Sequence, residues 1–177
     1  KGKVIVFAPE ASDLYNGSII SKKYNFGNLE NEMEGRHRKG HFDGVGTVVS
    51  LLLKLVTPNN AYFGEKDFQQ LQIVKKLVEI EKLSVNVVGC PIVREKSGLA
   101  MSSRNNRLSA SQFEAAALIH QTLSEVKQNF NSMSISELNE LVKNRFSNNN
   151  FLKPEYFEIA NAKTLKTVHR KHKNIIK

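Results

Sequence analysis

The strongest constraint on the fold is an alternation of apolar patterns in the middle of the chain. Residues 45–56 carry apolar side chains too densely for a surface stripe, which is typical of a largely buried helix. A short apolar run at 61–63 precedes an amphipathic pattern at 67–82, and another apolar run follows at 85–90. A strand, a helix and a strand joined by short connections are typical of a βαβ unit. We therefore predict an α/β fold with a parallel sheet and flanking helices.

Weaker patterns predict further elements on both sides of this unit. They indicate strands at 4–8 and 19–26, a short helix at 29–34 ended by Gly35, a basic loop at 36–44, helices at 110–129 and 134–146, and a strand at 156–160. Ser109 can cap the first of the two long helices, and Ser134 with Glu137 has the pattern of a capping box for the second. Because the character of the sequence changes between 92 and 108, we place a domain boundary there.

Composition excludes some classes of protein. The 177 residues are 40% hydrophobic and 24% charged, as in an ordinary soluble domain. No apolar run is long enough for a transmembrane helix and no signal peptide is visible, so we expect no membrane partner. The single cysteine, Cys90, excludes an intramolecular disulfide, and we interpret it as a small buried hydrophobic residue in a reducing cytosol.

The net charge of +9 is compatible with two kinds of partner. A basic protein binds nucleic acid, or it gathers a polyanionic small molecule such as a nucleotide. Part of the excess lies in residues 163–177, which hold six Lys or Arg residues and no carboxylate. No aromatic residue is interleaved with these charges, which argues against a nucleic-acid-binding surface and favours a solvated end.

The first candidate site is the segment FGEKDFQQ at 63–70, where a predicted strand passes into a predicted helix. In open parallel sheets, ligands bind beyond the carboxyl ends of the strands, where helix N-termini offer N–H groups to anions. Gly64 lets the backbone approach a ligand, and Lys66 can reach a phosphate. Alternatively, Asp67 and Gln70 form only a capping box.

The second candidate site is GLAMSSRN at 98–105. Ser102, Ser103 and Arg104 can donate to several phosphate oxygens at once, and Gly98 would let the loop move like a lid. Alternatively, the segment is a polar turn that leads to the cap at Ser109.

The third candidate site is the basic segment RHRKGHF at 36–42. Metal binding by His37 and His41 lacks a third ligand nearby and would place a cation among positive charges, so we expect no metal site. An anion-contacting loop or a plain basic surface remain the two interpretations. His120 falls within a predicted helix and is interpreted as structural.

Taken in order, these segments resemble the pantothenate synthetase family, also called pantoate–β-alanine ligases. The matching text is GRHRKGHFDGVGTVVSLLLKLVTPNNAYFGEKDFQQLQIVKKLV followed by VGCPIVREKSGLAMSSRNNRLS, and the close similarity spans residues 33–111. The specific part is FGEKDFQQL at this distance from GLAMSSRN.

The resemblance implies a cytoplasmic, usually dimeric enzyme of the nucleotidylyltransferase superfamily. Residues 1–92 would be the C-terminal part of a Rossmann-like domain that binds nucleotide and pantoate. Residues 93–177 would be a smaller α/β domain that carries the MSSR loop at its start. The implied substrates are ATP with Mg²⁺, pantoate and β-alanine, with no tightly bound organic cofactor. The implied reaction forms pantoyl adenylate and pyrophosphate, after which β-alanine displaces AMP to give pantothenate.

The resemblance also implies roles for individual residues. Those implied to bind ATP are Gly64, Glu65, Lys66, Asp67, Val93, Met101, Ser102, Ser103 and Arg104, and those implied to be catalytic are Lys66, Ser102, Ser103 and Arg104. Gln70 matches the glutamine that binds pantoate, and Val93 matches a position that contacts adenine through its backbone. Arg38 and His41 fall in the segment on the β-alanine side.

The chain departs from the family pattern at three places. The N-terminal Pro-Thr-Met-Gly segment with its two ATP-binding histidines is missing, and so is a closing segment near Leu-Ile-Asp-Asn. We therefore expect a fragment that is inactive by itself. Lys39 stands where the family commonly has proline. The alternatives are a basic nucleic-acid-binding module, another adenylate-forming ligase of the same superfamily, and a fragment without catalysis.

Overall fold

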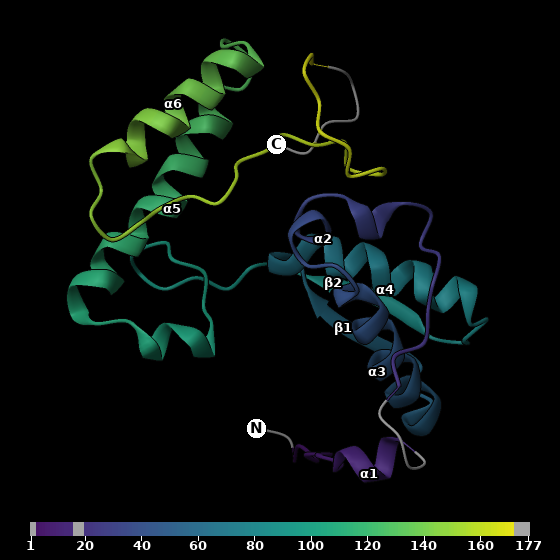
Figure 1. The fold of residues 1–177 in the computed structure, drawn as a ribbon. Helices are drawn as coiled ribbons and strands as arrows, with labels where there is room; N and C mark the ends of the chain where they lie inside the picture. The colour runs from purple at the N-terminus through teal and green to yellow at the C-terminus, as the bar shows by residue number, and fades with distance from the viewer. Residues whose placement is uncertain (1–2, 16–19, 172–177) are drawn as a thin grey trace. The chain divides into compact units, whose positions relative to one another are not determined.

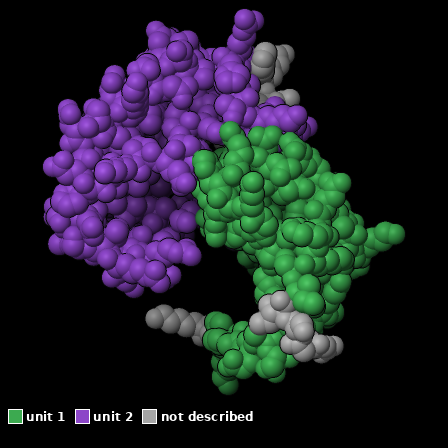
Figure 2. All heavy atoms as spheres, in the orientation of Figure 1, with its two compact units in different colours: residues 1–63, 67–89 green, residues 64–66, 90–177 purple. Residues whose placement is uncertain are grey.

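The computed structural model describes residues 3–15 and 20–171. The chain divides into two compact units, one made of Lys1–Phe63 and Asp67–Gly89 and the other of Gly64–Lys66 and Cys90–Lys177 (Figure 2). Most residues of the two strands described below belong to the first unit, and the last residue of each strand belongs to the second. Among the described residues, no helix combines the length and apolarity that crossing a membrane requires.

The first unit is built on the predicted strand–helix–strand unit. Strands β1 (Asn60–Gly64) and β2 (Asn86–Cys90) form a two-stranded parallel sheet, and α4 (Phe68–Ile80) connects them (Figure 1). The amide of Asn86 donates to the carbonyl of Asn59 at 2.9 Å, which sets the register at the start of the sheet. Helix α3 (His41–Val56) packs against α4. The predicted α/β fold is confirmed.

The core of this unit lies between α3, α4 and the segment that precedes them. Phe26, Phe42, Ile73 and Leu77 are buried together, and the apolar spacing in α4 places the last two on one face. The ring of Phe26 stacks on that of Tyr24 at a centroid distance of 5.3 Å. Burial of these large side chains provides the main stabilisation of the unit.

The region before α3 is more helical than its charge density predicted. A 3₁₀ turn, η1 (Leu29–Asn31), is followed by α2 (Glu34–His37), and α3 begins at His41, inside the segment predicted as a loop. The prediction that Gly35 ends a helix is wrong. Gly35 lies inside α2. A Cβ at this position would meet the carbonyl oxygen of Glu30 at 1.9 Å, so only glycine allows this close approach.

The apolar run at 4–8 does not form the predicted buried strand. Val4, Ile5 and Val6 are 84–93% exposed, and a short helix, α1 (Ala11–Leu14), follows. A strand requires a hydrogen-bonded neighbour, and no strand of the described residues pairs with this run. Residues 20–26 likewise form no strand, whereas Ile19 lies outside the described residues.

The second unit contains the two long helices predicted from their caps. Helix α5 (Ala110–Asn129) begins after Ser109, and α6 (Ile135–Ser147) begins after Ser134, each with a complete capping box. The helices pack against each other, and their shared core contains Val126, Phe130, Ile135, Leu138, Val142 and Ile159. Both predicted helices and caps are confirmed.

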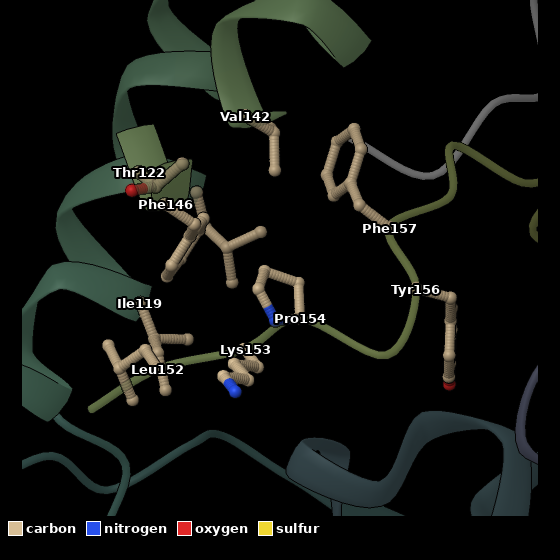
Figure 3. A pocket seen from close by; sticks show the side chains of 10 residues that line it. Ile119, Thr122, Val142, Phe146, Leu152, Lys153, Pro154, Tyr156 and Phe157 are labelled. Carbon is tan, nitrogen blue, oxygen red and sulfur yellow. The ribbon is translucent and has the colours of Figure 1, made fainter. Parts of the chain in front are cut away.

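An apolar cavity of about 270 Å³ lies between α5, α6 and residues 152–157 of this unit. Ile119 and Thr122 of α5 and Phe146 of α6 form part of its wall, and Leu152 and Pro154 also line it (Figure 3). The hydroxyl oxygen of Thr122 is buried without a hydrogen-bond partner. The cavity wall therefore contains a buried polar group whose hydrogen bonding is unsatisfied.

Two smaller expectations in this part of the chain are wrong. The predicted strand at 156–160 is irregular backbone that ends in an antiparallel bridge between Ala160 and Thr167, because no other part of the described chain pairs with it along its length. Cys90 is half-buried rather than buried, since it ends β2. Of the basic tail, residues 163–171 are described, and residues 172–177 lie outside the described part.

Candidate functional site

The first candidate segment lies at the transition from β1 to α4, as its sequence predicts. Gly64 ends β1, a 3₁₀ turn, η2 (Glu65–Asp67), follows, and α4 starts at Phe68. Glu65, Lys66 and Asp67 are exposed. Asp67 occupies the N-cap position but makes no side-chain capping hydrogen bond, so the interpretation of Asp67 and Gln70 as a capping box is wrong.

Gln69 is a structural residue that the sequence reasoning missed. Its side chain is 5% exposed, and its amide nitrogen donates to the backbone carbonyls of Leu29 at 2.8 Å and Glu32 at 2.7 Å. This amide therefore ties the first turn of α4 to the segment before α2. Gln70, the residue matched to pantoate binding, follows directly and is half-buried. The available signal was the spacing of Gln69 with Ile73, which places it on the buried face of α4.

The third candidate segment forms the end of α2 and the start of α3. Gly40 takes a left-handed conformation (φ 74°) at the N-cap, so the chain turns between Arg38 and His41. Burial and the nearby positive charge of Arg38 lower the pKa of His41, while the carboxylate of Glu34 raises it. Phe42, whose ring lies 5.0 Å from that of His41, anchors this turn in the core. The site therefore holds His41 as a half-buried imidazole near an exposed guanidinium.

The second candidate segment continues from a short hairpin in the second unit. Arg94 and Ala100 form an antiparallel bridge, and the amide of Met101 donates to the carbonyl of Val93 at 2.9 Å. The two residues matched to ATP binding, Val93 and Met101, are thus hydrogen-bonded neighbours. Both side chains are exposed.

Beyond the hairpin, the chain enters a 3₁₀ turn, η3 (Ser103–Arg107). The hydroxyl of Ser102 accepts a hydrogen bond from the amide of Arg104 at 3.2 Å, and the side-chain amide of Asn105 donates to the carbonyl of Ala100 at 3.0 Å. Ser103 and Arg104 are exposed. The segment is therefore an ordered turn that presents a hydroxyl and a guanidinium to solvent. It also leads to the cap at Ser109, so the two interpretations of this segment are compatible.

Gly98 is more constrained than a hinge residue. Its φ is +89°, and a Cβ at this position would lie 2.3 Å from Nδ1 of His120.

The described residues contain no group of three or more His, Cys, Asp or Glu side chains placed to hold a metal ion.

Each unit carries polar and basic groups of the kinds that can bind an anion. In the second unit, Met101, Ser102, Ser103 and Arg104 follow one another from the hairpin into the 3₁₀ turn η3. In the first unit, Arg38 and His41 lie on either side of the turn at Gly40. Hydroxyl, guanidinium and ammonium groups of this kind stabilise phosphate oxygens without covalent chemistry.

Comparison with known proteins identifies the family of the chain. The family model described as pantoate-beta-alanine ligase matches residues 1–177. The chain belongs to this family. The pantothenate synthetase of Flavobacterium psychrophilum is 50% identical over 172 residues, which cover 97% of this chain and 61% of that protein. The pantothenate synthetase of Christiangramia forsetii is 52% identical over 168 residues, which cover 95% of this chain and 59% of that protein.

Solved structures of the pantoate–β-alanine ligase family share the fold. The crystal structure of pantothenate synthetase from Thermus thermophilus aligns with a TM-score of 0.87 at 34% identity, covering 96% of this chain and 62% of that one. A pantoate-beta-alanine ligase from Francisella tularensis, solved as a complex with beta-gamma ATP and beta-alanine, aligns with a TM-score of 0.62 at 33% identity. That alignment covers 76% of this chain and 50% of that one. The chain thus spans about three fifths of the length of the curated relatives it matches.

Proposed function

We propose that this chain supplies the segments 63–70 and 98–105 to an enzyme that uses Mg-ATP to join pantoate to β-alanine. The observation that carries the proposal is the match of the whole chain, which includes both segments, to the pantoate–β-alanine ligase family. The relative from Francisella tularensis was solved with an ATP analogue and β-alanine, which supports the same substrates here. Magnesium enters as part of the nucleotide substrate.

The proposed reaction has two steps. A carboxylate oxygen of pantoate attacks the α-phosphorus of ATP, and the bond to the bridging oxygen breaks, so that pyrophosphate leaves and pantoyl adenylate forms. The amine of β-alanine then attacks the acyl carbon of the adenylate, its proton is released, and AMP leaves. Both steps need positioning and charge stabilisation more than a covalent intermediate on the protein.

The exposed groups of the second candidate segment suit the first step. Ser102, Ser103 and Arg104 would donate to the triphosphate, and Lys66 would offset the charge that develops on the departing pyrophosphate. In this proposal Gly64, Glu65, Asp67, Val93 and Met101 contact the nucleotide, and Gln70 binds pantoate. Arg38 and His41 lie on the β-alanine side. We further propose that residues 1–92 and 93–177 act as two domains of a cytoplasmic homodimer.

Calorimetric titration of the chain with Mg-ATP tests the proposal. Arg104→Ala should weaken the affinity about tenfold or more, because a hydrogen bond to a charged group contributes about 1.5–3 kcal/mol. Arg107→Ala is the matched control, since Arg107 lies in the same 3₁₀ turn but outside the matched MSSR segment. Equal losses for both variants would show only general attraction by positive charge. An unchanged affinity for Mg-ATP in Arg104→Ala would overturn the assignment of this turn to the triphosphate.

A further inference from the structure

The contact between His120 and Gly98 links α5 to the segment that holds Met101–Arg104. His120 lies in the middle of α5, and its ring lies under the backbone of Gly98 in the hairpin. A Cβ on Gly98 would lie 2.3 Å from Nδ1, 3.0 Å from Cγ and 3.1 Å from Cε1 of this ring. Only a residue without a Cβ leaves room for the backbone to rest this closely on the imidazole.

The hairpin that contains Gly98 is held together by several hydrogen bonds. The amide of Glu95 donates to the carbonyl of Leu99 at 2.8 Å, and the amide of Gly98 donates to the carbonyl of Glu95 at 2.9 Å. The guanidinium of Arg94 donates to the carbonyl of Gly98 at 3.1 Å, and Leu99 is buried. A displacement of Gly98 would therefore move the whole hairpin, including Ala100, which directly precedes Met101.

Both ends of the segment 101–108 are thereby fixed to the same helix. One end follows the hairpin that rests on His120, and the other enters α5 through the capping box of Ser109 with Gln112. Helix α5 itself is held against α6 by buried side chains such as Val126. The ring of His120 is oriented from the other side by Ser124, whose hydroxyl lies 3.4 Å from Nε2.

We propose that His120 is a positioning residue for the segment Met101–Arg104: its ring supports Gly98 and so sets where this segment lies. The inference rests on the proposed function, because it gives His120 a role in presenting the triphosphate-binding groups. His120 touches neither nucleotide nor reacting atoms in this account. It acts only through the hairpin.

The test uses a readout of position that does not depend on nucleotide binding. In protein labelled with ¹³C at the methionine methyl groups, His120→Ala should shift the Met101 methyl signal and leave that of Met33 unmoved. It should also accelerate hydrogen exchange of the Glu95 and Met101 amides, on the order of tenfold, because both donate within the hairpin. His120→Phe keeps a flat ring beneath Gly98 and should restore both readouts. His169→Ala, in the described part of the tail, is the matched control.

A double-mutant cycle isolates the contact itself. Gly98→Ala adds a methyl group against the ring and also strains a positive φ, whereas Gly27→Ala strains a similar φ of +72° with nothing within 4 Å. Gly98→Ala should therefore lower the thermal midpoint more than Gly27→Ala does. Combining Gly98→Ala with His120→Ala should recover part of that difference.

The outcomes separate the inference from the proposed function. If His120→Ala shifts the Met101 methyl signal and also lowers the affinity for Mg-ATP, the result supports both the positioning role and the proposed function. Shifts without any dependence of ATP binding on Arg104 support the positioning role and overturn the proposed function. The positioning role is overturned if His120→Ala changes neither the Met101 methyl signal nor the exchange of the hairpin amides, whatever the affinity for ATP.

Discussion

The α-carbon of Gly35 lies so close to Glu30 that a methyl group on it would be 1.9 Å from the Glu30 carbonyl oxygen. The obstacle is backbone and cannot turn aside, so Gly35→Ala should destabilise the protein by about 3 kcal/mol. Gly44→Ala is the matched control in α3, where an added Cβ meets nothing within 4 Å. That substitution should stabilise the protein by about 1 kcal/mol, since alanine favours a helix. Urea unfolding followed by circular dichroism measures both, and equal effects would contradict the contact.

Glu81 binds two lysines that come from different parts of the first unit. It pairs with Lys22 and with Lys54, the latter at 2.5 Å, and its side chain is 8% exposed. Hydrogen bonds from Lys22 and then from Lys54 lower the pKa of Glu81 from 4.5 to about 2. Since the folded pKa lies below the unfolded one, this stabilisation is present above pH 4.5 and is lost as the pH falls toward 2.

Glu81→Gln should therefore lower stability at neutral pH and flatten the loss of stability below pH 4.5. We expect a cost of about 1 kcal/mol, because both lysines are half-exposed and their charges are screened by water. Glu79→Gln, two residues earlier and in the last turn of α4, is the control, since its pair with Lys76 is exposed. Thermal unfolding across the acid range measures this, and an unchanged pH dependence in Glu81→Gln would argue against the cluster.

Replacing each of two buried threonines by valine should change the stability of the protein in opposite directions. The hydroxyl of Thr122 has no partner, so Thr122→Val should stabilise the second unit by about 1 kcal/mol. The hydroxyl of Thr47 donates to the carbonyl of Asp43 at 2.7 Å and accepts from the amide of Lys22 at 2.8 Å. Thr47→Val should cost about 1 kcal/mol for these two bonds. Thermal midpoints of the two variants decide the matter, and a loss in Thr122→Val would mean that its hydroxyl is satisfied in solution.

His41 should titrate below its ordinary pKa of 6.5, because burial and Arg38 disfavour the charged ring. Since the folded pKa is lowered, the stability that the neutral ring allows is present above pH 6.5 and falls as the ring is protonated. Arg38→Gln should raise this pKa, and Glu34→Gln should lower it further. Imidazole signals followed by NMR across the range from about pH 4 to pH 8 measure the shifts. The same direction in both variants would refute the assigned causes.

Local sequence patterns predicted the helices and strands that depend mainly on interactions between residues near one another in the chain. The alternation at 61–90 predicted β1, α4 and β2, and the caps at Ser109 and Ser134 predicted where α5 and α6 begin. The strand predicted at 4–8 was wrong because a strand needs a hydrogen-bonded neighbour, and an apolar run does not show whether such a neighbour is present. The segment 36–44 was predicted as a loop from its charge, yet it contains the end of α2 and the start of α3, and charge density alone does not exclude a helix.

The same division applies to the candidate site. The exposed groups of segments 63–70 and 98–105 stand out in the sequence because their types suit phosphate. The roles of Gln69 and His120 could not be predicted, since each depends on a distant backbone. The amide of Gln69 reaches carbonyls 37 and 40 residues away, and His120 meets a glycine in a different element.

The water-facing run Val4–Phe7 also bears on how this protein behaves when it is concentrated. Exposed apolar side chains in a segment that pairs with no strand can form intermolecular β-structure, which valine, isoleucine and phenylalanine favour strongly. Copies of the chain in a concentrated sample would aggregate through this run before either unit unfolds. A charged residue in place of Ile5 would then improve solubility without changing the thermal midpoint of either unit.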